Sequence, residues 1–289
     1  KNSFSTDSIT HLDRCLTCRS CESTCPSGVQ YHQLLDIGRE ALEVKRPLWQ
    51  KMYRYGVRQF ITTPALFNSV GFLFKHSDIQ TQKQTPNSVI GKVLLLGGCA
   101  QPKLAPNINH SIGNILAKLN YEVTETPQKE CCGAVDQHLG ATKAALDKVK
   151  YNIDRWLDVE ADFIISSASG CGLMVKDYVD LFDKQDAYYQ KALMISSKTL
   201  DIAQFLADQD LSLLNPEKTK ISYHEPCTLQ HGQKLKGLVE SILTQVGYDL
   251  SLVNDSHLCC GSAGTYSIFE PKIAKMLKNN KLENLNASN

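Results

Sequence analysis

The sequence predicts an α/β protein in which a helical, cysteine-rich N-terminal segment precedes two copies of one α/β unit. Three observations predict this class. Short apolar runs typical of buried strands alternate with longer runs whose apolar residues recur at helical spacing. The 11 cysteines form three groups, and the second and third groups repeat the same internal spacing. Hydrophobic residues make up 42% of the 289 positions, enough to bury a sizeable core in two or three domains.

The N-terminal segment carries four cysteines in the pattern Cys15-x-x-Cys18-x-x-Cys21-x-x-x-Cys25, with Pro26 directly after the last one. This is the spacing of the bacterial ferredoxin run, in which a tight loop turns three thiolates toward one [4Fe–4S] cluster. Thiolates are soft ligands that suit iron–sulfur clusters. The alternative is a zinc knuckle or a chance run of buried cysteines, although zinc sites usually space their cysteine pairs farther apart.

In two-cluster ferredoxins the fourth cysteine of such a run binds the other cluster. Cys25 would then serve a second cluster, while Cys15, Cys18 and Cys21 hold the first. Neither cluster is complete with these cysteines alone, so we expect a second run of the same kind upstream of Lys1. The full-length protein would hold two [4Fe–4S] clusters, and the lack of a starting methionine agrees with truncation at the N-terminus.

Residues 46–88 are predicted to be a helical connector followed by a linker. Residues 46–76 are rich in aromatic and basic side chains, and the polar residues 77–88 are typical of a linker. The aromatic residues favour packing between domains, with an amphipathic surface for a membrane or a quinone as the alternative. They are Trp49, Tyr53, Tyr55, Phe60, Phe67, Phe72 and Phe74.

Each α/β copy is predicted to begin with a buried strand and a turn that ends in a cysteine. The strands are expected at 93–96 and 221–223, shortly before Cys99 and Cys227. A helix follows in both copies, and we expect its apolar stripe to be core. The stripes are Ile112, Ile115, Leu116 and Leu119 in the first copy and Leu235, Leu238, Ile242 and Val246 in the second.

A cysteine doublet followed by glycine comes next in both copies, at Cys131-Cys132 and Cys259-Cys260. The first cysteine of each doublet lies 32 residues after the single cysteine of its copy (131 − 99 and 259 − 227). Such agreement is improbable by chance, so we interpret the two segments as an internal repeat. The strands expected before the doublets lie at 121–123 and 248–250.

The first copy continues beyond its doublet with a predicted helix at 146–156 and a strand at 163–165, which leads to Cys171 in the sequence Ser-Gly-Cys-Gly. Strand–helix alternation predicts a largely parallel sheet whose strand ends and loops carry the cysteines. Cys171 lies 39 residues after the doublet (171 − 132). The counterpart in the second copy would fall beyond Asn289, so we expect that copy to be cut short.

These patterns divide the chain into four predicted parts. Residues 1–45 are the C-terminal part of a helical two-cluster ferredoxin-like [4Fe–4S] domain, and residues 46–88 are the connector and linker. Residues 89–215, the first repeat, and residues 216–289, the truncated second repeat, are expected to form one pseudo-symmetric α/β unit.

The cysteines of each repeat would gather at one end of its sheet if an irregular loop at the glycine aims both doublet sulfurs inward. We interpret them as metal ligands, with buried structural thiols or a redox-active disulfide as alternatives. The candidate ligands are Cys99, Cys131, Cys132 and Cys171 in the first repeat and Cys227, Cys259 and Cys260 in the second. The nearby histidines, which could bind iron or carry protons, are His138, His224, His231 and His257.

Composition and missing signatures narrow the function. Lys and Arg total 31 against 30 Asp and Glu, so no single-sign field argues for nucleic acid. The first ten residues are polar and no run of about 18 apolar residues occurs, which predicts a cytoplasmic protein. Because G-x-G-x-x-G, Walker and G-x-S-x-G motifs are missing from the sequence, we expect no catalytic residue for substrate oxidation in this chain.

Four sequence stretches together resemble the iron–sulfur subunit of glycolate oxidase (glycolate dehydrogenase), within the wider group of cysteine-rich CCG-domain proteins. The stretches are HLDRCLTCRSCESTCPSGV at 11–29, SGCG at 169–172, PCTLQH at 226–231 and DSHLCCGSAGTY at 255–266. The resemblance covers nearly all of the chain. These long strings are more specific than the cysteine spacing alone.

The resemblance implies an electron-transfer subunit that is not catalytic alone. A partner subunit carrying FAD would oxidise glycolate to glyoxylate, and this chain would pass the electrons toward a quinone-linked acceptor. The implied [4Fe–4S] ligands are Cys15, Cys18, Cys21 and Cys25, and the CCG cysteines would hold a further cluster or metal. Peripheral association with the cytoplasmic face of the inner membrane is a further expectation.

Other readings of the resemblance stay open. Related subunits act in lactate or glycerol 3-phosphate oxidation, so the choice of glycolate rests on the resemblance alone. A thiol–disulfide enzyme of the heterodisulfide reductase type and a structural or metal-storing module are further alternatives. In heterodisulfide reductase subunits the CCG pattern closes with C-x-x-C, whereas Met174 stands three residues after Cys171 here. A site of that type in the first repeat would need another ligand.

Overall fold

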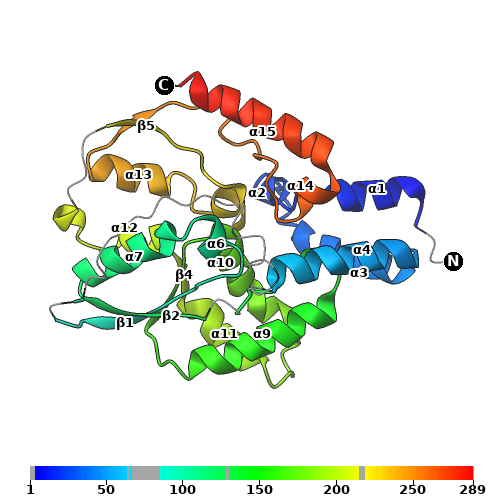
Figure 1. Cartoon of the computed structure of the whole chain (residues 1–289), viewed down its shortest axis with the longest axis horizontal. Helices are drawn as coiled ribbons and strands as arrows, with labels where there is room; N and C mark the ends of the chain where they lie inside the picture. The colour runs from blue at the N-terminus through cyan, green and yellow to red at the C-terminus, as the bar shows by residue number, and fades with distance from the viewer. Residues whose placement is uncertain are drawn as a thin grey trace. The chain divides into compact units, whose positions relative to one another are not determined.

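The computed structural model describes residues 4–63, 66, 85–86, 88–127, 130–214 and 219–288 (Figure 1). It divides into two compact units. Unit 1 consists of Lys1–Lys51, Gln137–Ala141 and Leu211–Asn289, and unit 2 consists of Met52–Asp136 and Thr142–Asp210. The first repeat therefore lies mainly in unit 2, whereas the second repeat shares unit 1 with the N-terminal cysteine run.

Unit 2 is built on a four-stranded parallel sheet. Its strands, in the spatial order β2-β1-β3-β4, are β1 (Gly91–Leu95), β2 (Tyr121–Glu125), β3 (Phe163–Ser166) and β4 (Thr199–Asp201). β1 is a central strand, in which Leu94 is in register with Thr124 of β2 and Ile164 of β3. A strand covered on both faces needs apolar residues at every position, which explains the unbroken apolar run at 93–96.

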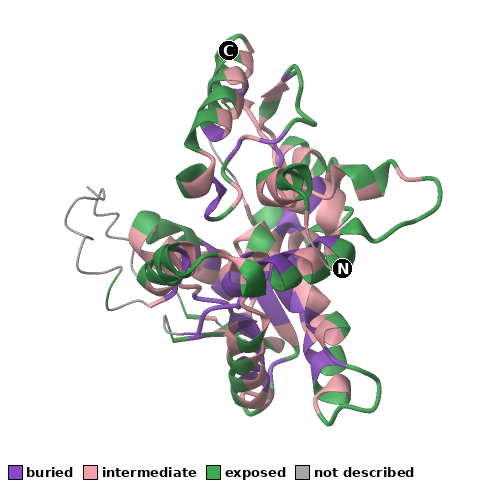
Figure 2. Ribbon diagram, turned by 90° about the vertical axis from the view of Figure 1, so that its right-hand side faces the viewer, coloured by how far each residue is buried: buried purple, intermediate pink, exposed green. Residues whose placement is uncertain are grey.

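Helices cover both faces of this sheet (Figure 1). One face is covered by α7 (Asn107–Lys118) and α12 (Ile202–Ala207), and the other by α9 (Thr142–Leu157), α10 (Ser169–Lys176) and α11 (Tyr189–Lys198). Val93 and Leu95 pack on the first face and Leu94 on the second, as the alternation of a strand requires. These buried residues are purple in Figure 2. Shorter elements are α6 (Gln101–Leu104), α8 (Ala134–His138) and η2 (Asp177–Leu181).

The predicted elements of the first repeat are confirmed, with one correction. The expected strands at 93–96, 121–123 and 163–165 correspond to β1, β2 and β3, and the expected helices correspond to α7 and α9. The Ser-Gly-Cys-Gly sequence, however, does not end a strand. It begins α10, because β3 stops at Ser166 and the backbone turns there, where the Ser166 hydroxyl donates to the carbonyl of Ala168.

Unit 1 is mainly helical around a small sheet. Its helices are α1 (Thr6–Arg14), α2 (Ser20–Ser23), α3 (Tyr31–Lys45), the start of α4 (Leu48–Thr62), α13 (Leu238–Gln245), α14 (Tyr266–Phe269) and α15 (Pro271–Asn286), with short turns η3 (Leu211–Leu213) and η4 (Thr228–Gly232). Ser5 caps α1, since its hydroxyl accepts a hydrogen bond from the N–H of Ser8. The strands β5 (Lys220–Ser222) and β6 (Asp249–Ser251) pair in parallel.

Two expectations about the second repeat are wrong. The two repeats do not form one α/β unit, because the second repeat lies in unit 1 and its strands β5 and β6 form a sheet separate from that of unit 2. The apolar stripe on α13 is not core either, since this helix has no buried residue among those described. A two-stranded sheet presents too little surface to cover the stripe, whereas the four strands of unit 2 bury Ile112 and Leu116 of α7.

The connector begins with α4, and its aromatic side chains are exposed. Trp49, Tyr53 and Tyr55 are 67%, 52% and 57% exposed, and their packing between domains stays a prediction. The other predicted contact residues Phe67, Phe72 and Phe74, and most of the linker at 77–88, lie outside the described residues. Within the described part of the chain, no helix has the length and apolar character needed to cross a membrane.

Candidate metal centres

Three thiols of the N-terminal run lie close together, with Cys15 and Cys18 in the loop between α1 and α2 and Cys21 in α2. Burial raises the pKa of Cys21, and the charges of neighbouring acidic groups, Cys18 and Cys15 among them, raise it further. The loop turns tightly because Thr17 and Arg19 adopt left-handed conformations, with φ of 53° and 58°. Binding a cationic centre would relieve the repulsion among these thiolates, so the loop suits a metal cluster.

Cys25 has a different environment from the other three cysteines of the run. Its sulfur accepts hydrogen bonds from the backbone N–H groups of Val29, Ser27 and Gly28, which lower the pKa of Cys25. Gly28 permits this turn with φ of 64°. A thiolate held apart in this way agrees with the idea that Cys25 serves a different cluster, which stays a prediction.

A buried arginine of α3 contacts this loop. Arg39 is 7% exposed, and it donates hydrogen bonds to the carbonyl oxygens of Leu12 (3.1 Å) and Cys15 (2.7 Å). Burial lowers the pKa of Arg39, and the negative charge of Cys15 opposes that shift. No motif marked Arg39, because its contact with Cys15 depends on how α3 packs against α1.

The four cysteines of the first repeat come together in unit 2. Hydrogen bonds link the side chains of Cys99 and Cys131, of Cys131 and Cys132, and of Cys132 and Cys171. These bonds raise the pKa of Cys99 and Cys132 and hold that of Cys131 well below its ordinary range. The cysteines follow β1, β2 and β3, and parallel strands bring such loops to one edge of the sheet. The predicted clustering is present, whereas the metal-ligand role stays a prediction.

Side chains from two helices hold the doublet of the first repeat by its carbonyl groups. Asn152 of α9 donates to the carbonyl of Cys131 (2.9 Å) and to the hydroxyl of Tyr178 (3.2 Å). Tyr178, which is fully buried, donates to the carbonyl of Cys132 (2.9 Å). Both doublet carbonyls therefore have a hydrogen-bond donor, which buried backbone acceptors in an irregular loop require.

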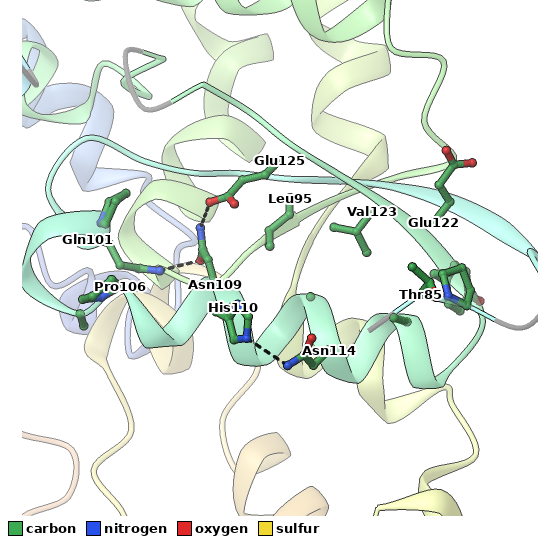
Figure 3. Close-up of a pocket in the computed structure, with 16 residues that line it drawn as sticks. Thr85, Leu95, Gln101, Pro106, Asn109, His110, Asn114, Glu122, Val123 and Glu125 are labelled. Atoms are coloured by element: carbon green, nitrogen blue, oxygen red, sulfur yellow. Dashed lines mark hydrogen bonds between the residues drawn. The ribbon is translucent and has the colours of Figure 1, made fainter. Parts of the chain in front are cut away.

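A second polar network ties the loop after β1 to the loop after β3. The Asn109 side-chain oxygen accepts from Gln101 (2.8 Å) and Ser167 (2.7 Å), and its amide nitrogen donates to Glu125 (2.9 Å) and to the carbonyl of Leu96 (3.2 Å). Figure 3 shows Asn109 between Gln101 and Glu125 at the edge of a pocket. The residues that line this pocket in the described part of the chain include no cysteine. The network therefore positions the loops of Cys99 and Cys171 without forming part of their cluster.

An ion-pair network also lies near the first cluster. Asp136 is completely buried, and it pairs with Lys148 (2.5 Å) and Arg58 (3.3 Å). Lys148 also donates to the hydroxyl of Thr62 (2.9 Å). The positive charge of Lys148 lowers the pKa of Cys131, but this effect is smaller than that of the hydrogen bonds with the other cysteines. A carboxylate therefore compensates this lysine within its own unit.

The three cysteines of the second repeat also cluster, with a histidine beside them. The sulfurs of Cys227 and Cys259 are 3.9 Å apart, and Cys260 is hydrogen bonded to Cys259 and His224. Hydrogen bonding with Cys259 lowers the pKa of Cys227 and raises that of Cys259 to about 11. The pKa of Cys260 is raised to about 11, first by its hydrogen bond with Cys259. Cysteine spacing alone had left His224 as one of four equal candidates.

Two of the other histidines have contacts elsewhere in unit 1. His231 Nδ1 lies 2.8 Å from the hydroxyl of Ser23, and His138 Nδ1 lies 3.7 Å from Asp36. Both contacts are within unit 1. His224 therefore becomes the histidine with the best claim to a ligand role, because an imidazole beside three thiolates completes four soft donors.

The N-terminal run and the second cluster are neighbours within unit 1. The charge of Cys18 acts on Cys227, and the hydrogen bond between Ser23 and His231 joins α2 to η4, the turn that follows Cys227. The sequence places these cysteines about 200 positions apart. Their proximity brings two sets of soft ligands into one compact unit.

The comparisons with known proteins agree with these cysteine sites. The family described as CCG, a cysteine-rich domain, matches residues 93–176 and 221–289, which lie in the two repeats. The glycolate oxidase iron–sulfur subunit of Escherichia coli (strain K12) is 43% identical over 296 residues, which is 95% of this chain and 73% of that protein. The chain belongs to this family of CCG-domain iron–sulfur subunits.

More distant relatives carry different descriptions. A protein of Bacillus subtilis (strain 168) described as a probable glycolate oxidase iron–sulfur subunit is 24% identical, over 96% of this chain and 73% of its own length. Lactate utilization protein A of Exiguobacterium sp. (strain ATCC BAA-1283 / AT1b) is also 24% identical, over 67% of this chain and 80% of its own length. No solved structure matches the chain.

Proposed function

We propose that this chain is the iron–sulfur subunit that transfers electrons in a glycolate-oxidising complex. One observation carries the proposal: soft sulfur ligands gather at three places in a chain that is 43% identical, over 95% of its length, to a glycolate oxidase iron–sulfur subunit. Iron–sulfur clusters supply one-electron carriers whose potentials the surrounding protein sets through charge, hydrogen bonds and burial.

In this proposal each cysteine set has a separate role. Cys15, Cys18 and Cys21 hold one [4Fe–4S] cluster, and Cys25 contributes to a second. Arg39 fixes the loop by its carbonyls and adds a positive charge close to Cys15. The two CCG sets hold further metal or cluster centres, one through Cys99, Cys131, Cys132 and Cys171 and the other through Cys227, Cys259, Cys260 and His224.

The proposal also defines the partners. Removing a hydride from glycolate needs a two-electron acceptor, so a separate FAD-carrying subunit performs that step. The chain then relays single electrons toward a quinone-linked acceptor. A cytoplasmic location, on the inner face of the membrane that holds the quinone, would suit this relay.

The test uses the complete complex with Cys18→Ser in this subunit. The flavin should still be bleached by glycolate, because substrate oxidation does not involve the cysteine. Reoxidation of the flavin by a quinone analogue should be lost, and the iron content should fall. Rapid-mixing spectroscopy follows both half-reactions.

The matched control is Ser20→Ala, which changes a residue between Cys18 and Cys21, at the start of α2, but keeps every cysteine. It should leave iron content and flavin reoxidation unchanged. Wild-type reoxidation rates in a Cys18→Ser complex that lacks the cluster would mean that electrons bypass this site, and the electron-transfer role would have to be withdrawn.

Lactate or glycerol 3-phosphate oxidation is the competing assignment, and the likeness to a lactate utilization protein is the observation in its favour. Which substrate is oxidised does not depend on electron transfer through the cysteine sites, so the rate of flavin reduction by each substrate is sufficient to decide it. Flavin bleaching in the purified complex should be at least about tenfold faster with glycolate than with either alternative. Turnover of a disulfide by this chain without any flavoprotein would instead favour a thiol–disulfide enzyme.

A further inference from the structure

The helix α15 carries a lysine that is almost completely buried. Lys281 is 3% exposed, and its Nζ donates hydrogen bonds to the carbonyl oxygens of Asp255 (2.8 Å) and Ser256 (3.4 Å). Both carbonyls belong to the loop that leads to the doublet of the second repeat. Among the described residues, no side-chain carboxylate lies within ion-pair distance of this ammonium group.

A buried cation is costly unless an anion compensates it. The negative charges that act on Lys281 come from Cys260, Asp255, Cys259 and Cys227, in that order. Three of these four groups are the thiols of the second repeat. The lysine is thus placed where deprotonation of these thiols, as on metal binding, would supply compensating charge, and no carboxylate of the described residues is in contact with it.

The position of Lys281 is fixed by a second contact of the same helix. Gly261, directly after the doublet, packs so closely on α15 that an added Cβ would lie 2.6 Å from the carbonyl oxygen of Ala274. Ala274 and Lys281 are seven residues apart, or two helical turns, so they lie on one face of α15. The helix therefore holds the doublet loop at two points and keeps the ammonium group at the carbonyls of Asp255 and Ser256, within reach of the charges of the thiols.

In the described part of the first repeat, the doublet loop is held without a buried cation that lacks a carboxylate partner. Asn152, seven residues after Ala145 of α9, is the counterpart of Lys281, and it binds the doublet loop with a neutral amide. The nearby Lys148 is compensated by the buried Asp136. Only the second of the two sites combines a buried ammonium group with thiols as its main counter-charge in the part of the chain that is described.

We propose that Lys281 is the fixed counter-charge of the second cysteine cluster and stabilises its thiolates when they bind a metal. This inference rests on the proposed metal-binding role of Cys227, Cys259 and Cys260. Metal binding releases the protons of the free thiols, and three thiolates around one divalent ion leave the site more negative than the protonated thiols did. A fixed cation favours the more negative state of the site, so it should tighten binding of a divalent metal and raise the reduction potential of a bound iron–sulfur cluster.

The experiment measures Co²⁺ binding to the metal-free chain by the near-ultraviolet absorption of cobalt–thiolate bonds. Each variant is paired with the same variant carrying Cys227→Ser, so that the difference reports the second cluster alone. The variants are Lys281→Met, Lys281→Gln and Lys281→Arg. Lys278→Met, on the exposed side of the same helix, is the matched control.

The three substitutions separate a charge from a clamp. Lys281→Met and Lys281→Gln should weaken Co²⁺ binding by at least about tenfold, whereas Lys281→Arg should stay within about threefold and Lys278→Met should equal the parent chain. Glutamine can still donate to the loop carbonyls. Parent-like affinity of Lys281→Gln would therefore reduce Lys281 to a structural clamp and overturn the proposal.

Two further measurements keep the outcome decisive. Far-ultraviolet circular dichroism identifies variants that fail to fold. The Co²⁺ affinity of such a variant is then replaced by the salt dependence of Co²⁺ affinity, measured in Lys281→Arg and in the parent chain. Equal affinity with and without Cys227→Ser in the parent chain would overturn metal binding at this cluster and the counter-charge together. Normal parent binding with no effect of Lys281→Gln would overturn the counter-charge alone.

Discussion

The two repeats build the same cysteine doublet on very different supports. In the first repeat the doublet lies at the edge of a four-stranded sheet covered on both faces, and uncharged Asn152 and Tyr178 hold its carbonyls. In the second repeat the sheet has two strands, and the charged Lys281 holds the loop that leads to the doublet. A doublet loop of this kind thus needs hydrogen-bond donors for its carbonyls, and the donor is neutral in one repeat and positively charged in the other.

This difference in charge has a functional consequence. A neutral donor leaves the electrostatics of the first cluster to its own thiols and to the Lys148–Asp136 pair. A charged donor adds a permanent positive field to the second cluster. In the metal-bound state proposed above, two centres with the same ligand spacing would then differ in reduction potential.

Removing the compensating carboxylate from the first repeat should give the largest difference in stability between a variant and its control. Asp136→Asn leaves Lys148 and Arg58 without their buried partner, and we expect a loss of about 3 kcal/mol in the unfolding free energy of unit 2. Urea unfolding followed by hydrogen exchange can assign the loss to unit 2. Asp147→Asn, in an exposed pair with Lys143 on α9, should cost at most about 0.5 kcal/mol. Equal losses for the two variants would contradict the compensation argument.

The sequence predicted the features that depend on local spacing of residues, and it missed the contacts that depend on how helices pack against distant loops. Apolar spacing located β1, β2, β3, α7 and α9, and cysteine spacing located both clusters. Neither signal could indicate Arg39 or Lys281, because each contacts a loop more than 20 residues away across a helix packing interface. The stripe of α13 was misjudged because helical periodicity does not tell how many strands lie beneath it. His224 was a candidate, and its contact with Cys260 distinguishes it from the other histidines.

Substituting the glycine after each doublet should separate the two repeats by a smaller margin. Gly133 and Gly261 both have left-handed backbones, with φ of 88° and 79°. A Cβ at Gly261 would lie 2.6 Å from the carbonyl of Ala274, whereas one at Gly133 would lie 3.4 Å from that of Ala145. We expect Gly261→Ala to cost about 3 kcal/mol, from backbone strain and overpacking, and Gly133→Ala about 1–2 kcal/mol, from strain alone.

Gly264 provides the control for this pair. Its φ is 55°, but an added Cβ would meet no atom within 4 Å, so Gly264→Ala reports strain without overpacking. Its cost should match that of Gly133→Ala in urea unfolding of the metal-free chain. A Gly261→Ala cost no larger than these two would mean that α15 moves away from the doublet easily, and α15 would then not be a rigid support.

The smallest expected effect concerns the reactivity of two cysteines with similar electrostatics and different exposure. Hydrogen bonds from neighbouring thiols lower the pKa of both Cys131 and Cys227. Cys131 is 2% exposed, whereas Cys227 is only partly buried. Iodoacetamide attacks the thiolate and needs access to it, so at pH 7.5 Cys227 should react at least about tenfold faster in the metal-free chain. Peptide mapping by mass spectrometry after timed quenching measures both rates in the same sample.

The pH dependence tests the cause of this difference. The rate at Cys227 should rise with pH and level off below the ordinary thiol pKa of about 8.5, because its folded-state pKa is lowered. By linkage, the lowered pKa stabilises the fold fully above about pH 8.5, and this contribution is lost as the pH falls through the folded-state pKa. Cys259→Ala removes the hydrogen bond that is the main cause, so the midpoint should move upward and the rate at pH 7.5 should fall. An unchanged midpoint in Cys259→Ala would show that the two sulfurs, 3.9 Å apart, do not share a proton, and the second cluster would then lack the thiol coupling seen in the first.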